Sequence, residues 1–375
     1  MRIRFRKLFT PVRIYRDMCL RIENGVVENI ENCRVHCDFH FPIVAPGFID
    51  SHTHGAAGID IMSAAVDDFQ KLSVFYAKHG VTTFLPTTVS DTFEKISRVA
   101  ETVKKFMNLK PEGARVAGIY VEGPYLNPNK KGAHKEDLLK RPDLEELSRF
   151  VERFGDVVKI FAIAPELKDS EKVIDFLKKK KIIPTIAHTD ATYDQAIVAI
   201  ENGCTRATHV FNAMRTFSHR EPGVVGAVLT DKRVFCEIIS DMIHLHPATV
   251  MMIMNIKGPY RSVLVTDSIA ATGLEDGEYS LGELQVVVQN KIARTKQDQS
   301  LAGSTLTLDE AVRNAVFKLN INARNAIMMA TYSAARSSNL DLGSILPGNC
   351  ADLVAMDENL NVLATFASGE PIYRI

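Results

Sequence analysis

Buried strands and amphipathic helices alternate along most of the chain. Eight short runs are apolar and rich in β-branched residues, and each ends in one or two polar residues before a segment of helical periodicity. We expect strands at 44–50, 81–88, 115–123, 158–166, 182–190, 206–214, 234–241 and 262–268. Continuous apolar runs are typical of parallel strands buried on both faces. Eight strand–helix units therefore predict an α/β fold with a (β/α)8 barrel of the TIM type.

The segments between these runs carry helix signals. Large apolar residues recur on one helical face over 67–79, and Gly80 follows as a residue suited to a left-handed C-cap. Segments 91–110 and 169–181 show the same pattern, and the second ends in a lysine run that favours the negative end of the helix dipole. These segments are expected to cover the strands.

The two ends of the chain predict a second, smaller unit. Short strand-like runs occur at 20–22, 26–30, 33–41, 351–356 and 360–366. We expect residues 1–45 and 346–375 to form one small β-sandwich domain beside a barrel of residues 46–345.

Two further segments are less easily assigned. The arginines at 2, 4 and 6 alternate with Ile3 and Phe5, which predicts an edge strand with one wet face. Segment 278–295 predicts a hairpin, and its sequence does not show which domain it packs against.

Composition limits the possible partners. The chain has 375 residues, 46% of them hydrophobic, and its 45 basic and 45 acidic residues balance. A large core is therefore possible, and no global charge favours nucleic acid or an anionic membrane. We find no apolar region typical of a secretion signal and no run long enough to span a bilayer, so we expect a cytoplasmic protein.

The six cysteines have no regular spacing, which is consistent with a reducing compartment. A zinc site built from Cys33, His36, Cys37 and His40 is conceivable. In a strand, however, the two cysteines would share one face and the two histidines the other, so the four could not surround one ion. We therefore interpret the cysteines as packing residues.

Side chains that can bind a metal ion or transfer a proton stand at the ends of six of the expected strands. They are His52 and His54 after the first, Glu122 after the third, His188 after the fifth, His209 after the sixth, Asp241 with His244 after the seventh, and Asp267 after the eighth. The carboxyl ends of barrel strands meet at one end of the barrel. A hydrogen-bonded loop position would explain any single histidine, but not five of the 11 at strand ends.

This set is suited to binding a metal and activating water. Glu122, His188 and His209 would supply three ligands and leave one position open for water. His52 and His54 share one side of an extended chain and could hold a second ion, with Glu122 bridging. Asp267 could accept a proton from the water and pass it to a leaving nitrogen. No Walker A motif, dinucleotide fingerprint or nucleophile elbow competes with a hydrolase function.

The sequence resembles the amidohydrolase superfamily and, within it, the family of N-acetylglucosamine-6-phosphate deacetylases. The matching segments extend over nearly the whole chain. They are Pro46 to Asp50 with His52 and His54, Val121 to Tyr125, Lys130 to His134, Ala164 to Glu166, Thr208-His209 with Asn212 to Met214, Arg220 to Gly223, Val265 to Ser268 and Leu301 to Thr305.

The resemblance implies a barrel of the metal-dependent hydrolase type that removes the acetyl group of N-acetyl-D-glucosamine 6-phosphate in amino-sugar metabolism. It implies one or two divalent ions, Zn2+ or Fe2+, and a homodimer. Asp267 and His134 would be catalytic, with His134 polarising the acetamide carbonyl. The implied metal ligands are Glu122, His188, His209, His52 and His54. The implied substrate-binding residues are His134, Asn212, Ala213, Arg220, His244, Leu301, Ala302 and Gly303.

One position departs from the family pattern, which commonly has glycine after the strand-seven aspartate. Here Met242 follows Asp241, and its side chain could shift His244.

Three alternatives stay open. The substrate could be N-acetylgalactosamine 6-phosphate, because no residue decides the configuration at C4. The enzyme could resemble a dihydroorotase or an isoaspartyl dipeptidase, which bridge two metals with a modified lysine on strand four. Here that strand offers only Lys159, at the end far from the site. A barrel kept only as an interaction module would be expected to lack some ligands, yet all are present.

Overall fold

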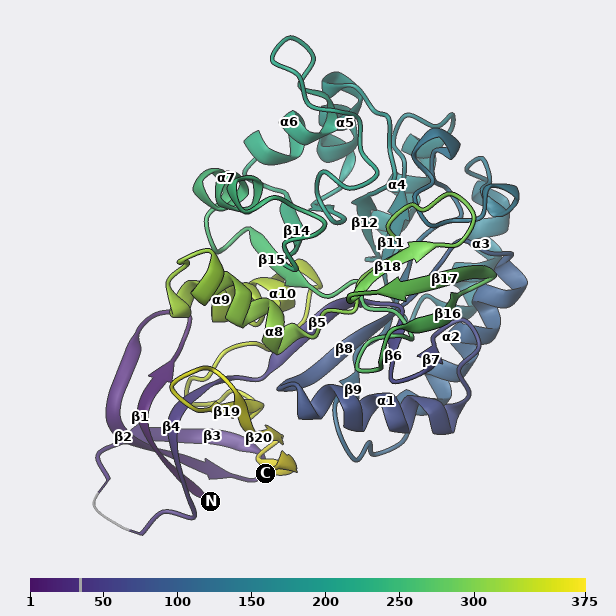
Figure 1. Ribbon diagram of the computed structural model, residues 1–375. Coiled ribbons are helices and arrows are strands. Elements are labelled where there is room, and N and C mark those ends of the chain that lie inside the picture. The colour runs from purple at the N-terminus through teal and green to yellow at the C-terminus, as the bar shows by residue number, and fades with distance from the viewer. Residues whose placement is uncertain (34–35) are drawn as a thin grey trace.

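A computed structural model describes residues 1–33 and 36–375, and a parallel barrel forms its centre (Figure 1). The eight barrel strands lie in the order β5 (Phe48–Thr53), β8 (Val81–Thr88), β10 (Ile119–Val121), β11 (Val158–Ile163), β12 (Ile183–Ile186), β13 (Arg206–Ala207), β14 (Phe235–Ile239) and β15 (Ser262–Val265). A short strand, β9 (Arg115–Val116), also pairs with β8. The predicted barrel is confirmed.

Contacts between the first and last strands bring the barrel close to closure. The backbone N–H of Asp267 donates to the carbonyl oxygen of His52 at 2.9 Å, and Thr53 and Ser268 form a parallel bridge. Every residue of β5 and β8 is buried. Both strands also carry buried polar residues, among them Thr87 and Thr88 at the end of β8.

Amphipathic helices surround the barrel and bury their apolar faces against it. In the described part of the chain they are α1 (Val66–Lys78), α2 (Phe93–Met107), α3 (Leu144–Phe154), α4 (Ser170–Lys179), α5 (Tyr193–Asn202), α6 (Gly223–Thr230), α7 (Pro247–Lys257), α8 (Leu308–Arg313), α9 (Ala323–Met329) and α10 (Tyr332–Ser337). The helices predicted at 67–79, 91–110 and 169–181 correspond to α1, α2 and α4. Gly80 has a φ of 77°, as expected for its position after α1. No helix among the described residues is long and apolar enough to cross a membrane.

The chain ends build one seven-stranded sheet below the barrel (Figure 1). Its strands lie in the order β21 (Glu370–Arg374), β20 (Val362–Ala367), β19 (Leu353–Met356), β4 (Phe39–Pro46), β1 (Arg2–Phe9), β2 (Ile14–Glu23) and β3 (Val26–Glu31). The division at residues 45/46 and 345/346 stays a prediction. The expectation of an edge strand at residues 2–6 is wrong, because β1 pairs with β2 on one side and β4 on the other.

Alternate residues of this sheet face two different cores. Val44 and Leu353 join a small cluster with Phe5 and Phe366, whereas Ile43 packs into the large cluster of the barrel. The period-two alternation of strand side chains produces this division. The sheet is thereby fixed to the base of the barrel, and β4 leads directly into β5, which carries His52 and His54.

The cysteine interpretation requires two corrections. The strand expected at 33–41 begins only at Phe39, and residues 34–35 lie outside the described residues. Cys33 forms a disulfide with Cys19 on β2, so these two cysteines are not simple packing residues. The argument from alternation had treated Cys33 as part of a strand, and local spacing gave no sign that Cys19 lies opposite it.

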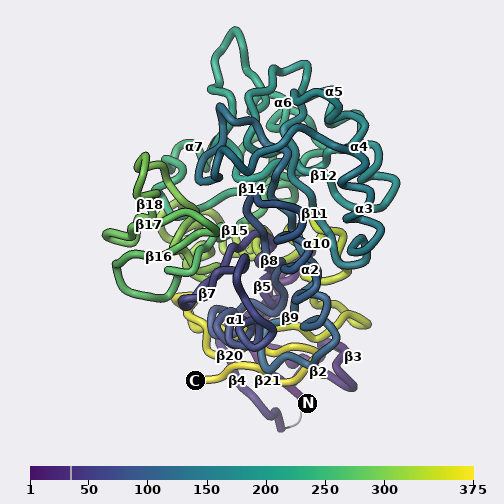
Figure 2. The backbone as a smooth tube through the Cα atoms, turned by 90° about the vertical axis from the view of Figure 1, so that its right-hand side faces the viewer, coloured from purple at the N-terminus to yellow at the C-terminus, as the bar shows by residue number. Residues whose placement is uncertain are grey.

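The segment expected to form a hairpin is a three-stranded antiparallel sheet, β16 (Gly277–Leu281), β17 (Leu284–Gln289) and β18 (Ile292–Thr295), seen to one side of the barrel in Figure 2. Leu281 and Val286 of this sheet share a buried cluster with Val89, Ile269 and Ala302. Val89 and Ile269 come just after β8 and β15. The small sheet therefore packs on the barrel, beside the carboxyl ends of its strands.

Candidate active site

The polar residues after the barrel strands converge on one buried point. His52 and His54 come from β5, and Glu122, His188, His209 and Asp267 follow β10, β12, β13 and β15. All six side chains are at least nine-tenths buried. Buried charged and imidazole groups of this number need paired charges or a metal ion.

Glu122 lies at the centre of the cluster and faces two groups of ring nitrogens. Its Oε2 is 3.5 Å from His52 Nε2 and 3.2 Å from His54 Nε2. Its Oε1 is 3.4 Å from His188 Nε2 and 3.2 Å from His209 Nε2. One carboxylate oxygen thus faces each histidine pair, which is the arrangement that a bridging ligand requires.

Three of these histidines are oriented as metal ligands are. Nδ1 of His52 lies 2.8 Å from Glu237, Nδ1 of His54 lies 3.1 Å from the carbonyl of Thr87, and Nδ1 of His188 lies 2.8 Å from the carbonyl of Lys130. Since each acceptor is an oxygen, each Nδ1 donates its proton and each Nε2 presents a lone pair to the cluster. An outer hydrogen bond that fixes the ring in this way is the common support of metal-bound histidine.

His134 has the opposite orientation. Its Nδ1 accepts a hydrogen bond from the backbone N–H of Ser90 at 3.1 Å, so the neutral ring carries its proton on Nε2. Burial lowers the pKa of His134 well below its usual value, and the nearby His188 lowers it further. His134 is therefore a neutral hydrogen-bond donor rather than a lone-pair ligand.

The carboxylates dominate the electrostatics of the cluster. Burial alone would lower the pKa of His54, but Asp267 and Glu122 raise it to about 9. Burial would likewise raise the pKa of Glu122, but His52 and the other histidines hold it well below its usual value. A site whose carboxylates stabilise protonated histidines so strongly also stabilises a divalent cation, which would bind in place of the ring protons. The ligand atoms and the negative electrostatic potential of the carboxylates both suit a metal ion.

Asp267 lies on the His52–His54 side of the cluster. Its Oδ1 is 3.1 Å from His54 Nε2 and 3.4 Å from His52 Nε2. Burial would raise the pKa of Asp267, but His52 and His54 hold it below its usual value. The carboxylate is therefore ionised and can accept a proton.

Two buried residues that the sequence did not single out support His52. The guanidinium of Arg206 donates to Glu237 Oε1 at 2.6 Å, and both side chains are fully buried. The other oxygen of Glu237 accepts from His52 and from the backbone N–H of His209 at 3.2 Å. Glu237 is the single charged residue in the apolar strand β14, and this was the sequence signal that could have revealed the pair, because charged residues are almost never fully buried unless they are paired.

A cavity of about 560 Å³ opens over this cluster. Among the expected substrate-binding residues, those that line it are His134, Asn212, Ala213, His244, Leu301 and Gly303. The cavity is also lined by Lys131, from the matching segment Lys130 to His134, and by Asp298, which the sequence did not single out; their side chains pair at 2.9 Å. Asp298 comes from the loop after β18, so the small sheet contributes one wall.

Two expected substrate-binding residues do not line the cavity. Ala302 is fully buried behind the wall and donates its backbone N–H to Ala293 at 3.1 Å. Arg220 is exposed in the loop before α6, where its backbone N–H contacts Ser218 at 3.4 Å. Within one chain, Arg220 therefore does not reach the cavity.

His244 lines the cavity even though Met242 follows Asp241 in the turn. Nδ1 of His244 donates to Asp241 Oδ2 at 2.7 Å, and the His244 backbone N–H donates to Asp241 Oδ1 at 2.9 Å. Met242 adopts a φ of 68°, a conformation that glycine adopts more readily. The Asp241 carboxylate holds the turn, and His244 still lines the cavity.

Comparisons with known proteins agree with this geometry. The model of the amidohydrolase family matches residues 43–372. The chain is 36% identical to N-acetylgalactosamine-6-phosphate deacetylase of Escherichia coli O157:H7, covering 98% of each chain. It is also 36% identical to N-acetylglucosamine-6-phosphate deacetylase of Vibrio furnissii, covering 94% of this chain and 89% of the relative.

A solved structure is similar over nearly the full length. It is a D267A variant of N-acetyl-D-glucosamine-6-phosphate deacetylase from Mycobacterium smegmatis in complex with N-acetyl-D-glucosamine-6-phosphate. The TM-score is 0.95, the identity is 32%, and 99% of each chain is covered.

Proposed function

Because the chain belongs to the amidohydrolase family, we propose that it hydrolyses N-acetyl-D-glucosamine 6-phosphate to D-glucosamine 6-phosphate and acetate. The chain is an amide hydrolase of the metal-dependent kind. The reaction belongs to amino-sugar catabolism and recycling.

The position of Glu122 between two pairs of Nε2 atoms carries this proposal. Glu122 is a buried carboxylate within 3.5 Å of four inward-facing ring nitrogens. Burying these charged groups costs free energy, and a neutral core would stabilise the fold at least as well. The alternative that uses a modified lysine on the fourth strand lacks support, since Lys159 contacts the region of Gly118 at the opposite end of β11. An interaction module would not need the ionised Asp267.

The metal site would be formed by Glu122, His188 and His209, with His52 and His54 able to hold a second ion. Imidazole and carboxylate donors without a thiolate suit Zn2+ or Fe2+. A divalent ion bound there supplies Lewis acidity and lowers the pKa of water toward neutrality.

Asp267 would transfer the proton, and His134 would polarise the acetamide carbonyl. The ionised Asp267 takes a proton from the attacking water and delivers it to the amide nitrogen as the C–N bond breaks. His134 donates its Nε2 proton to the acetamide oxygen, where negative charge develops. Its neutral state suits this role, because the proton is fixed on Nε2 by the Ser90 hydrogen bond.

The sugar phosphate would lie across the rest of the cavity. Asn212, Ala213 and His244 offer polar contacts to the phosphate, and Leu301 and Gly303 shape the wall against the sugar. Ala302 acts from behind this wall by fixing the backbone between them. Arg220 would complete the phosphate site from a second subunit of a cytoplasmic homodimer.

Release of free amine tests the proposal. The metal-stripped protein is reconstituted with Zn2+ or Fe2+ and assayed with the 6-phosphates of N-acetylglucosamine and N-acetylgalactosamine and with unphosphorylated N-acetylglucosamine. Metal-dependent amine release from a 6-phosphate, much faster than from the free sugar, supports the proposal. Equal rates on the free sugar would contradict it.

N-acetylgalactosamine 6-phosphate is the second candidate substrate. It is favoured by the similarity to the Escherichia coli relative, which covers 98% of both chains. The ratio of kcat/KM for the two 6-phosphates decides between the candidates.

A further inference from the structure

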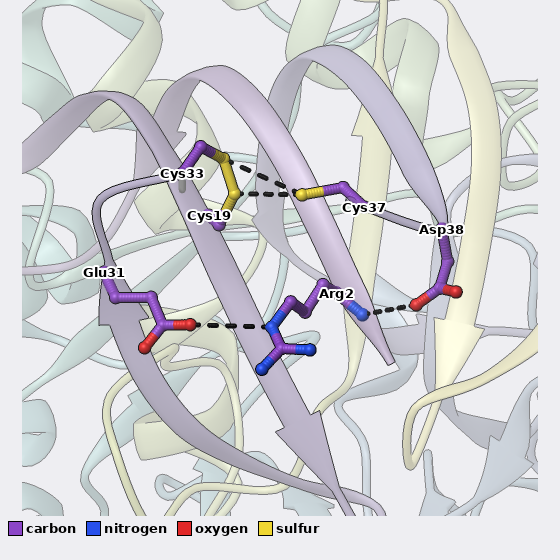
Figure 3. The surroundings of a disulfide bond; sticks show 6 residues. All are labelled: Arg2, Cys19, Glu31, Cys33, Cys37 and Asp38. Atoms are coloured by element: carbon purple, nitrogen blue, oxygen red, sulfur yellow. Dashed lines mark hydrogen bonds and ion pairs between the residues drawn. A yellow bond between two sulfur atoms is a disulfide. The ribbon is translucent and has the colours of Figure 1, made fainter. Parts of the chain in front are cut away.

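Three cysteines lie close together at the seven-stranded sheet (Figure 3), and none of them lines the cavity of the active site. Cys19 on β2 is joined to Cys33, which lies beyond the end of β3. Cys37, which lies outside the disulfide, has its Sγ 3.0 Å from Cys19 Sγ and 3.7 Å from Cys33 Sγ. A thiol in contact with a disulfide is the reactant pair of thiol–disulfide exchange.

The three sulfurs differ in their access to solvent. Cys19 and Cys37 are 1% and 4% exposed, whereas Cys33 is partly exposed. A disulfide between Cys19 and Cys37 would thus be buried, and its formation would release the outermost sulfur of the three.

Contacts of the next residue, Asp38, hold Cys37 beside β1, the strand that pairs with β2 and its Cys19. The backbone N–H of Arg2 donates to the Asp38 carboxylate at 2.6 Å, and the N–H of Asp38 donates to the carbonyl of Arg2 at 2.9 Å. Figure 3 shows Asp38 paired with Arg2 directly after Cys37.

We propose that Cys19, Cys33 and Cys37 form a thiol–disulfide exchange site, at which the exchange presents Cys33 as a thiol to soluble thiol-reactive molecules. Cys37 loses its proton to solvent, its side chain rotates onto the axis of the Cys19–Cys33 bond, and its sulfur bonds to Cys19 Sγ. The bond between Cys19 and Cys33 breaks, its electron pair passes to Cys33 Sγ, and that sulfur takes up a proton. One disulfide is present before and after, so the step needs no oxidant.

Alkylation without reductant tests the exchange. The full-length protein carries Cys350→Ser, which removes another partly exposed cysteine, and is first oxidised with glutathione disulfide and freed of it. The folded protein is then incubated with iodoacetamide, quenched in acid and mapped as unreduced peptides. We expect alkylated Cys33 to accumulate together with a peptide pair linked through Cys19 and Cys37. In the structure Cys33 is within a disulfide, so its alkylation reports the exchange directly.

Cys37→Ser is the matched control, because it removes the attacking sulfur and leaves the Cys19–Cys33 pair. Alkylation of Cys33 should fall at least tenfold in this variant. Cys33→Ala should form the Cys19–Cys37 disulfide outright. Deacetylase activity within about twofold of the starting protein verifies folding in each case, and Cys37→Ala replaces the serine variant if that one fails to fold.

Three results would overturn the proposal. One is equal alkylation of Cys33 with and without Cys37. Another is alkylated Cys33 with no peptide linked through Cys19 and Cys37. The third is a protein that keeps all three thiols after oxidation, or that holds them on a bound Zn2+ ion instead.

Discussion

Asp267 combines an ionised carboxylate with a backbone that aims it into the cavity. Its φ of 51° is uncommon for a residue other than glycine, and such conformations concentrate at functional sites. Replacement by asparagine keeps the volume of the side chain but removes the ability to accept and deliver a proton.

We therefore predict that Asp267→Asn lowers kcat by roughly 10²- to 10⁴-fold while the metal content stays near that of the wild type. Amine release and metal analysis of the same preparation give the two quantities. Turnover near the wild-type rate would assign the proton transfer to another group.

Glu237 and Arg206 offer a second test at the residue scale. Glu237→Gln should weaken metal binding by roughly 10- to 100-fold, because the hydrogen bond that orients His52 loses its charge. The single change also leaves Arg206 buried beside a neutral partner, which costs about 3–5 kcal/mol of stability.

The double variant Arg206→Met with Glu237→Gln separates the two effects. Removing both charges should recover much of the free energy of unfolding but not the metal affinity. Metal titration and denaturant unfolding measure these quantities. Recovery of metal affinity in the double variant would show that Glu237 acts only through folding.

At the scale of the elements, the strand ends divide the proposed ligands into two groups. His52 and His54 leave β5 together, whereas His188 and His209 follow β12 and β13. We predict that His188→Ala or His209→Ala lowers both activity and bound metal. The double change of His52 and His54 to alanine should remove at most one metal equivalent and leave partial activity. Equal metal loss in all these variants would argue for a single shared site.

Gly303 tests how the loop after β18 positions Asp267. A β-carbon at Gly303 would lie 2.7 Å from the carbonyl oxygen of Asp267, and Gly303 has a φ of 56°. Gly258 also has a positive φ, 65°, with a ψ of 173°, but a β-carbon there would have no atom within 4 Å.

Both alanine substitutions should lower stability, because alanine is disfavoured at positive φ. Gly303→Ala should lose more stability than Gly258→Ala, because its β-carbon would also lie too close to the Asp267 carbonyl. Only Gly303→Ala should also lower kcat, through the displacement of Asp267. Unfolding and steady-state kinetics make the comparison, and equal kcat values in the two variants would exclude a positioning effect of Gly303.

The sequence located the elements better than it located their ends. The β8 strand matches its predicted bounds residue for residue, because most of its residues are β-branched and favour a buried strand. The β12 strand ends at Ile186 instead of 190, since His188 has a φ of 43° and leaves the strand direction. No sequence pattern shows that a histidine adopts this conformation.

The same limit applies to the site. The proposed ligands could be singled out because each follows an expected strand, whereas Glu237 and Arg206 act through contacts between neighbouring strands that spacing along one chain does not reveal. The contact between Cys19 and Cys33 escaped prediction for the same reason, as it joins β2 to a separate segment.

At the scale of the whole molecule, the cavity of one chain has no arginine among the described residues that line it. Arg220 is exposed, and Phe217 in the same loop has 49% of its surface exposed. Aromatic and arginine side chains are enriched at protein interfaces. These observations favour a homodimer in which Arg220 enters the cavity of the partner subunit.

If Arg220 binds the phosphate, Arg220→Ala should lower kcat/KM for the 6-phosphate by roughly 10- to 100-fold, the value of a charge-assisted hydrogen bond of about 1.5–3 kcal/mol. The free sugar should be affected much less, because it presents no anion. An unchanged preference for the phosphorylated substrate would remove Arg220 from substrate recognition.

Mixed dimers then show which subunit supplies the arginine. Arg220→Ala chains retain Asp267, and Asp267→Asn chains retain Arg220, so a hybrid dimer has one site with both groups only if Arg220 crosses the interface. After equal mixing and exchange, half of the dimers are hybrids and half of their sites are intact, which predicts about a quarter of wild-type activity on the 6-phosphate. Differently tagged chains allow the hybrids to be isolated and verified. If Arg220 acted within its own chain, every site in a hybrid would lack one group, and the isolated hybrids would be no more active than the average of the two parent variants.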